Sequence, residues 1–179
     1  MKPNPLTSID RVNELLSYDQ ETGTFTWKVD RNWNSKAGSM AGSLRRDGYI
    51  SLKIDGERML AHRIAWLIVN GTDPLVIDHA DGNRSNNSIR NLRDGTHSEN
   101  CGNAKKHKAA KNPFKCVQWR EKDSKWQARI CVRGRRRSLG HFTTAEAAAA
   151  AYKAAALAEF GEYARFSTPD PEHADQIAA

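Results

Sequence analysis

Residues 76–103 read VIDHADGNRSNNSIRNLRDGTHSENCGN, and the interpretation of the whole chain depends on this stretch. The apolar run at 75–77 predicts a short buried strand that ends in Asp78 and His79. The triplet DGN at 81–83 predicts a turn, because glycine adopts positive φ at no steric cost and Asp and Asn tolerate it. The stretch therefore begins as a strand that turns back.

A return segment and a helix complete this pattern. NLR at 91–93 predicts the return strand, which Asn91 heads. Thr96 and Glu99 have the spacing of a capping box, so we expect a helix to begin there and to carry Asn100 in its first turns. A strand, a return strand and a helix bring four polar residues close together: Asp78, His79, Asn91 and Asn100.

Such a set suits hydrolysis of a phosphodiester bond. A carboxylate and an amide oxygen can hold a hard divalent cation, which keeps waters and takes a substrate phosphate as a further ligand. A neutral histidine can accept the proton of the attacking water near pH 7. The cation then offsets the charge that develops on the phosphate and the leaving oxygen. The alternative is that a lone Asp-His or Asn-Asn pair belongs only to a surface turn. The spacing of the four residues, together with the sequence around them, favours a functional site over this alternative.

The spacing of Asp78-His79, Asn91 and Asn100 resembles the HNH endonuclease motif, in the variant whose last histidine is replaced by asparagine. The words HRIAW at 62–66, DHADGNRSNN at 78–87, NLR at 91–93 and SEN at 98–100 are similar to those of phage-encoded and homing HNH nucleases. The resemblance implies a ββα-metal unit that binds one divalent ion and cuts or nicks DNA. By position, it implies that Asp78 and Asn100 are metal ligands and that His79 is the general base. Asn91 would pin the hairpin and orient His79.

The expected metal is Mg²⁺, with Mn²⁺ as the alternative. The three cysteines, Cys101, Cys116 and Cys131, form no CxxC pair, so neither a disulfide framework nor a structural zinc is expected. The 179 residues suffice for one medium domain or two small ones. No apolar run approaches the length of a membrane span, and the start MKPNPLTSID lacks an apolar signal segment. We therefore expect a cytoplasmic protein of a bacterial or phage-infected cell.

Positive charge is concentrated in residues 101–140, which hold 13 basic and 2 acidic side chains. Residues 1–100 are neutral overall and residues 141–179 carry −4, within a formal net charge of +7. This density predicts a polyanionic partner. The alternatives are a solvated basic face with no partner and an anionic membrane. The membrane is disfavoured because the basic residues lie on expected strands rather than on an amphipathic helix.

Residues 114–166 show alternation with a period of two, which predicts strands with one face inward. Val117 and Trp119 alternate with Gln118 and Arg120, and the pattern recurs from 126 to 133. RGR at 133–135 predicts a turn, and 136–142 a third strand. We expect the tryptophans in the core. The outward and turn residues expected to contact DNA are Gln118, Arg120, Lys125, Arg129, Arg133, Arg136 and Arg137.

A helix is expected to cover the inner face of these strands. Thr143 and Glu146 have capping-box spacing, and the alanine-rich run at 145–160 is a strong helix former with Gly161 as its stop. The words CVQWREKDSKWQARI and RRRSLGHFTTAEAAAAAYKAAALAEFGEYARF resemble the AP2/ERF DNA-binding domain, a three-stranded sheet packed on one helix. The resemblance implies that the sheet enters the major groove. Departures at Cys116, Gln118, Cys131 and Ser138 mean that the plant-type target sequence is not carried over.

The first sixty residues resemble the lead-in of phage HNH proteins and are interpreted as scaffold. We expect a helix at 7–18, a strand at 24–28, a loop or irregular hairpin at 30–47, and a strand at 49–54. Asp55-Gly56 predicts a hairpin turn, and a helix is expected at 61–69. The HRIAW resemblance raises the prospect that His62 or Arg63 faces the phosphate backbone, against the alternative of a hydrogen-bonded structural histidine.

The resulting prediction is an α+β protein with a ββα-metal unit followed by a three-stranded antiparallel sheet packed on one helix. The expected divisions are a scaffold at 1–60, a nuclease at 61–103, a basic linker at 104–112, a DNA-binding domain at 113–167 and an acidic tail at 168–179. The expected function is a metal-dependent endonuclease of double-stranded DNA, of homing or phage type, acting as a monomer or homodimer. Two alternatives stay open: a DNA-binding regulator with an inactive nuclease unit, and a general phage nuclease for packaging or host-DNA breakdown.

Overall fold

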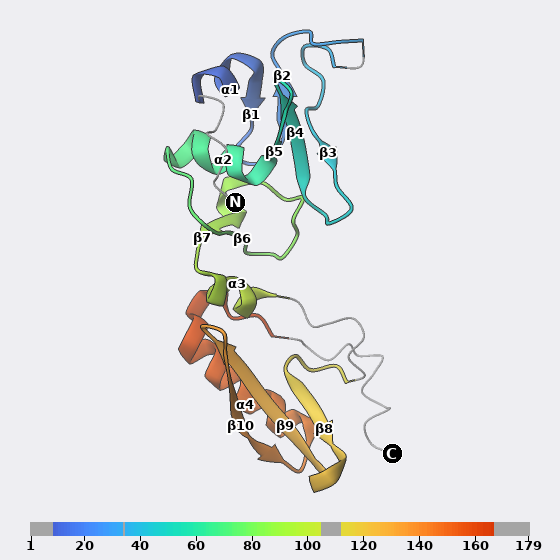
Figure 1. Ribbon diagram of the computed structural model, residues 1–179, viewed down its shortest axis with the longest axis vertical. Helices are drawn as coiled ribbons and strands as arrows, with labels where there is room; N and C mark the ends of the chain where they lie inside the picture. Colours follow the sequence, from blue (N-terminus) through green and yellow to red (C-terminus); the bar gives the residue numbers. More distant parts are fainter. Residues whose placement is uncertain (1–8, 34, 105–111, 167–179) are drawn as a thin grey trace. The chain divides into compact units, whose positions relative to one another are not determined.

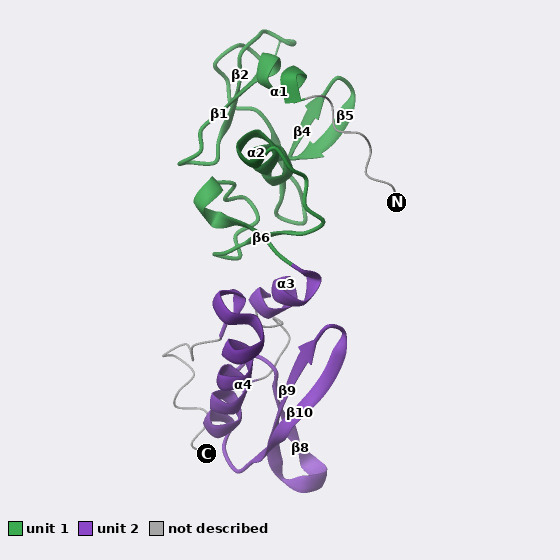
Figure 2. Ribbon diagram, turned by 90° about the vertical axis from the view of Figure 1, so that its left-hand side faces the viewer, with its two compact units in different colours: residues 1–95 green, residues 96–179 purple. Residues whose placement is uncertain are grey.

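The computed structural model describes residues 9–33, 35–104 and 112–166 (Figure 1). The expected acidic tail and all but the two end residues of the expected basic linker lie outside these ranges. The chain divides into two compact units, residues 1–95 and 96–179 (Figure 2). Both mix helices with small antiparallel sheets, as the α+β prediction requires. The division falls after Gly95, inside the stretch that the sequence assigned to the nuclease.

The described residues of unit 1, 9–33 and 35–95, form three small antiparallel sheets and two helices. In chain order these elements are α1 (Ile9–Leu15), β1 (Leu16–Tyr18), β2 (Phe25–Trp27), β3 (Ser43–Leu44), β4 (Ile50–Ile54), β5 (Glu57–Leu60), α2 (Ala61–Asn70), β6 (Ile77–His79), the 3₁₀ turn Ile89–Asn91 and β7 (Leu92–Asp94). The sheets pair β1 with β2, β4 with both β3 and β5, and β6 with β7.

The β4–β5 hairpin and α2 form where the sequence predicted them. Asp55 and Gly56 both adopt positive φ, at 46° and 93°, as a two-residue hairpin turn demands. Leu52 and Ile54 are buried on the face of β4 that packs against the rest of the core, while α2 ends at Gly71 in the left-handed conformation. The local patterns were therefore sufficient for this part of the fold.

Two predictions about unit 1 were wrong in detail. The helix expected at 7–18 ends at Leu15, because residues 16–18 pair with β2 and Tyr18 stacks on Phe25 with ring centroids 4.7 Å apart. Leu75 was expected in a buried strand, yet 84% of it is exposed and β6 begins at Ile77. In both places tertiary contact, rather than the local apolar pattern, decides where the element begins or ends.

The turn between β1 and β2 braces the loop that leads into Asn91. The hydroxyl of Tyr18 donates to the carbonyl of Asn87 at 2.7 Å, and the amide of Ile89 donates to the carbonyl of Gln20 at 3.1 Å. Gly23 adopts a φ of 74°, and a Cβ there would lie only 2.2 Å from the backbone nitrogen of Ser88. Only glycine fits this close approach, so the N-terminal scaffold directly supports the candidate site.

In unit 2, residues 96–104 and 112–166 are described and form a three-stranded antiparallel sheet and two helices. Its elements are α3 (His97–Asn103), β8 (Val117–Arg120), the 3₁₀ turn Glu121–Asp123, β9 (Lys125–Val132), β10 (Arg135–Phe142), α4 (Ala145–Phe160) and the 3₁₀ turn Gly161–Tyr163. The strand order is β10-β9-β8, and α4 lies along one face of this sheet (Figures 1 and 2). The core between them holds Val117, Ala128 and Ile130 from the sheet and Ala148, Tyr152 and Ala156 from the helix.

The capping box expected of Thr143 and Glu146 does not form at the start of α4, whereas its end lies at the predicted Gly161. The N-cap is Thr144, not Thr143, and its hydroxyl accepts a hydrogen bond from the amide of Ala147 at 3.2 Å. Gly161 caps the other end at a φ of 53°. Within the described ranges, no helix has both the length and the apolar character that crossing a membrane requires.

Candidate active site

The β6–β7 hairpin of unit 1 brings together three of the four residues expected to form the site. Asp78 and His79 lie on β6, and Asn91 immediately precedes β7. All three are buried, with exposed fractions of 3%, 4% and 9%. Asn100 lies on α3, which belongs to unit 2.

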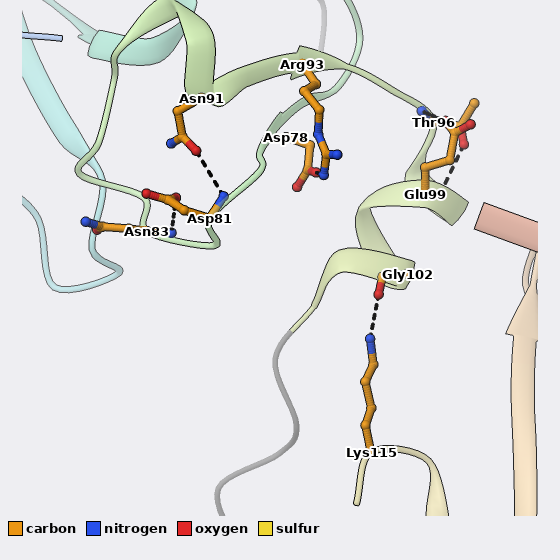
Figure 3. Close-up of polar contacts among 9 residues, drawn as sticks. All are labelled: Asp78, Asp81, Asn83, Asn91, Arg93, Thr96, Glu99, Gly102 and Lys115. Carbon is orange, nitrogen blue, oxygen red and sulfur yellow. Dashed lines mark hydrogen bonds and ion pairs between the residues drawn. The ribbon is translucent and has the colours of Figure 1, made fainter. Parts of the chain in front are cut away.

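Asn91 ties down the loop that joins the two strands. Its Oδ1 accepts a hydrogen bond from the amide of Asp81 at 2.9 Å, and its Nδ2 donates to the carbonyl of Asn86 at 2.8 Å. Figure 3 shows the first of these contacts, together with the Asp81 carboxylate that accepts from the amide of Asn83 at 2.7 Å. The side chain thus fixes both ends of the turn that follows His79.

Asp78 forms an ion pair across the hairpin. Arg93 is its partner in the strand register, and a guanidinium nitrogen lies 2.6 Å from Asp78 Oδ2 (Figure 3). The exposed fractions of the two side chains are 4% for Asp78 and 17% for Arg93, so the pair is largely removed from solvent. The carboxylate is therefore held in one orientation on the strand beside His79.

Carboxylate and amide oxygens, the groups that Asp78 and Asn100 carry, are typical ligands of a hard divalent cation. A carboxylate and an amide supply oxygen ligands, and two protein ligands suit Mg²⁺, which keeps several waters and is commonly shared with substrate phosphates. In the described part of the chain, no group of three or more His, Cys, Asp and Glu side chains is gathered as a metal cage. An all-protein cage is not what this chemistry needs, because water and phosphate complete the coordination.

His79 is enclosed by a cluster of rings. Its centroid lies 5.1 Å from that of His62, at an interplanar angle of 78°, and 5.8 Å from that of Tyr49. Burial lowers the pKa of His79, and Arg84 lowers it further, whereas a side-chain hydrogen bond to Asn87 and the charges of Asp81 and Asp78 raise it. The imidazole is therefore neutral near pH 7, which is the form that can accept a proton.

Tyr49 and Arg84 are part of this cluster, and the sequence analysis assigned neither a role. The guanidinium carbon of Arg84 lies 4.9 Å from the centroid of the Tyr49 ring, and Arg84 also donates to the carbonyl of Asp47 at 2.9 Å. Arg84 lies within DHADGNRSNN, which was quoted for the resemblance, and Tyr49 lies in the first sixty residues, but no local period connects residue 49 to residue 84. Arg63, considered for the phosphate backbone, instead forms an ion pair with Asp73.

The burial of His62 predicts an acid-sensitive fold. Burial lowers the pKa of His62 from 6.5 to about 3, with smaller contributions from His79 and Arg63. Because the folded pKa lies below the unfolded one, the unfolded chain binds the proton more readily and stability is lost as the pH falls through 6.5 towards 3. Between pH 7 and pH 5 the free energy of unfolding falls by about 2 kcal/mol for this reason.

Urea unfolding at the two pH values measures this loss, with His62→Phe as the non-titrating variant. On acidification, we expect the free energy of unfolding of the variant to fall by about 2 kcal/mol less than that of the wild type. His97→Phe removes a histidine outside the ring cluster and should leave the pH dependence unchanged. Equal losses in the wild type and His62→Phe would show that His62 does not carry the effect.

Comparison with known proteins agrees with the position of this hairpin. Residues 59–101 match the family model described as HNH endonuclease. This match spans β6, the loop and β7. The chain is also similar to "Protein 3.8" of Escherichia phage T7, with 29% identity over 107 residues, which cover 59% of this chain and 88% of the phage protein. No solved structure matches the chain significantly.

A second candidate surface lies on the sheet of unit 2, on the face opposite α4. Strand register places Gln118 beside Gln127, Arg120 beside Lys125, and Arg136 beside Cys131 on this face, which we call the outer face. Arg129 is held at its centre: Nε donates to Gln127 Oε1 at 2.8 Å and a terminal nitrogen donates to Gln118 Oε1 at 3.4 Å. Arg133 lies in the turn between β9 and β10, with a φ of 48°.

The strand register corrects the expectation for Arg137, and the exposed fraction of Trp119 corrects a second one. Arg137 pairs with Ile130, on the face turned towards α4, and forms an ion pair with Glu159 at 2.9 Å, so it does not join the outer face. Trp119 was expected in the core but is 42% exposed, packing edge-on against Trp126 at 5.3 Å. Gln127 lies on the outer face as expected, and it is buried there because Arg129 and Ser138 contact it.

Proposed function

We propose that this protein is a metal-dependent endonuclease of the HNH type, which hydrolyses phosphodiester bonds of double-stranded DNA. The observation that carries the proposal is the coincidence of the family match at 59–101 with the hairpin that holds a neutral, buried His79 beside Asp78. In this proposal unit 2 docks the DNA through its outer face. The similarity to a phage protein favours a homing or phage-encoded role.

His79 would accept the proton of the attacking water, since its imidazole is neutral near pH 7. Asp78 and Asn100 would hold the divalent cation, which when bound offsets the charge on the phosphate and leaving oxygen. Asn91 would keep the loop after His79 in place through its contacts with Asp81 and Asn86. The expected cation is Mg²⁺, with Mn²⁺ as the alternative.

DNA binding must also make His79 reachable, because only 4% of it is exposed here. Arg84 lies over Tyr49 beside the ring cluster and is therefore placed to meet a phosphate. Catalytic contacts commonly tighten only in the substrate complex, so the enclosed ring is compatible with the proposed role.

A DNA-binding regulator is the second candidate, and the basic outer face of unit 2 is the observation that favours it. The retained set of Asp78, His79, Asn91 and Asn100 favours the nuclease. Supercoiled plasmid incubated with Mg²⁺ or Mn²⁺ separates the two. We expect nicking or linearisation that EDTA abolishes. Tight duplex binding without cleavage in either metal would support the regulator.

Whether the plasmid is nicked or linearised indicates whether the protein acts as a monomer or as a homodimer. One ββα site contacts one scissile phosphate, so a monomer is expected to nick, whereas a homodimer can cut both strands. Nicked circles that accumulate at low protein concentration and linear DNA that forms at high concentration would indicate the homodimer.

A further inference from the structure

Helix α3, which carries Asn100, is anchored at both ends by residues of unit 2. At its start, the hydroxyl of Thr96 accepts from the amide of Glu99 at 3.2 Å, and the Glu99 carboxylate accepts from the amide of Thr96 at 2.7 Å (Figure 3). One residue into the helix, Ser98 Oγ accepts a hydrogen bond at 3.0 Å from the amide of Arg133, in the β9–β10 turn. The capping box begins the helix, and the sheet of unit 2 holds its first turn.

The other end of α3 is held at Gly102. Its carbonyl accepts from Lys115 Nζ at 2.6 Å, shown in Figure 3, and from the amide of Arg165 at 3.2 Å. A Cβ at Gly102 would lie 2.7 Å from Cγ of Phe160, the last residue of α4. The absence of a side chain at this position therefore permits the helix end to approach α4 closely.

Lys115 is an unusual side chain for this task, because only 8% of it is exposed and burial lowers its pKa. Its ammonium lies 5.9 Å from the centroid of the Tyr152 ring and also within 3.5 Å of the Arg165 carbonyl. Burying a lysine is costly unless its donors are used. Here the donors satisfy carbonyls at the end of α3 and after α4, so the lysine joins these two segments.

We propose that Lys115 and Phe160 are positioning residues for Asn100: the DNA-docking unit holds the helix that carries one of the two expected metal ligands. This inference rests on the proposed function for its catalytic meaning. Its structural part concerns unit 2 alone. It follows that the region matching the nuclease family, residues 59–101, contains the capping box of α3 but not the residues that hold the other end of this helix.

The test is Lys115→Met in the full chain, with Lys153→Met as the matched control. Methionine keeps the length and apolar stem but removes the donor that reaches Gly102. Lys153 lies on α4 beside Phe166, so its replacement makes the same charge change away from α3. In the metal-free protein, hydrogen exchange of the α3 amides should speed up about tenfold in Lys115→Met and stay unchanged in Lys153→Met.

The enzymatic readout is the metal concentration that gives half-maximal cleavage. It should rise about tenfold in Lys115→Met, and saturating metal should restore most of the rate, because the ligand is misplaced rather than removed. Duplex affinity without metal should change less than about twofold, since the outer face is untouched. Because a bound metal would also stabilise a destabilised protein, thermal melting without metal must show that Lys115→Met is fully folded at the assay temperature.

Gly102→Ala gives an independent test if Lys115→Met does not fold. Alanine is the better helix former by about 1 kcal/mol, so an isolated helix would become more protected. Crowding against Phe160 predicts the opposite, faster exchange in α3. Unchanged or slower exchange in the folded variants would overturn the inference. If the wild type cleaves no DNA, the proposed function fails, while the exchange measurement still decides whether these residues hold α3.

Discussion

His79→Ala is expected to abolish DNA cleavage while leaving DNA binding intact. Loss of a general base lowers the rate constant of the chemical step by roughly 10²- to 10⁴-fold. No neighbour can replace it easily, because burial lowers the pKa of His62 to about 3 and that imidazole packs edge-on against the His79 ring rather than taking its place. The measurement is single-turnover cleavage of supercoiled plasmid at saturating Mg²⁺ or Mn²⁺.

Two controls separate a chemical defect from a folding defect. His97→Ala removes a histidine outside the ring cluster and should cleave like the wild type. Thermal melting and duplex affinity without metal should show that His79→Ala is folded and docks normally. If a folded His79→Ala protein keeps more than about a tenth of the wild-type rate, His79 is not the general base.

The elements that sequence alone predicted well are those specified by neighbouring residues. Thr96 and Glu99 form both contacts of the capping box, and Asp55-Gly56 forms its hairpin turn. Period-two alternation identified β8 and β9 because α4 covers one face of the sheet and leaves the other in contact with solvent. In each case the physical cause lies within a few residues of the pattern.

The details that sequence missed depend on contacts between distant segments. The ring cluster around His79 joins residues from β6, α2 and the start of β4, and no local period connects them. Gly23 is required by the approach of Ser88, 65 positions away in the sequence numbering. Likewise, α1 stops early because Tyr18 stacks on Phe25. Burial and close approach of this kind can be recognised only once the chain is folded.

The outer face illustrates how an irregular strand limits a prediction made from periodicity. The register between β9 and β10 shifts between Ser138 and Gly140, so Leu139 is the extra residue of a bulge. Before it, Arg136 lies outward and Arg137 lies towards α4. A dense run of arginines does not reveal which members share a face. Strand pairing does reveal it. Because the adjacent residues Arg136 and Arg137 lie on opposite faces, replacing each in turn tests which face contacts DNA.

Replacing Arg120 and Arg136 together with alanine is expected to weaken duplex binding by roughly 10- to 100-fold at moderate salt. Both side chains lie on the outer face, and Arg136 is exposed. Removing one arginine–phosphate interaction should lower the slope of log affinity against log salt concentration by about 0.9, so the double variant should lower it by up to about 2. Fluorescence anisotropy of a labelled duplex over a salt series measures both quantities.

Arg137→Ala is the matched control for Arg136→Ala, because the two residues are adjacent, carry the same charge and lie on opposite faces. If binding depends on the outer face, Arg136→Ala should weaken it and Arg137→Ala should leave it within about twofold. Melting of Arg137→Ala must be checked, since the variant also removes the ion pair with Glu159 on α4. Equal reductions in the two variants would mean that only total charge attracts the DNA, and the outer face would then have no special role. A reduction confined to Arg136 would instead place the duplex against the face that Gln118, Arg129 and Arg136 share, opposite the helix.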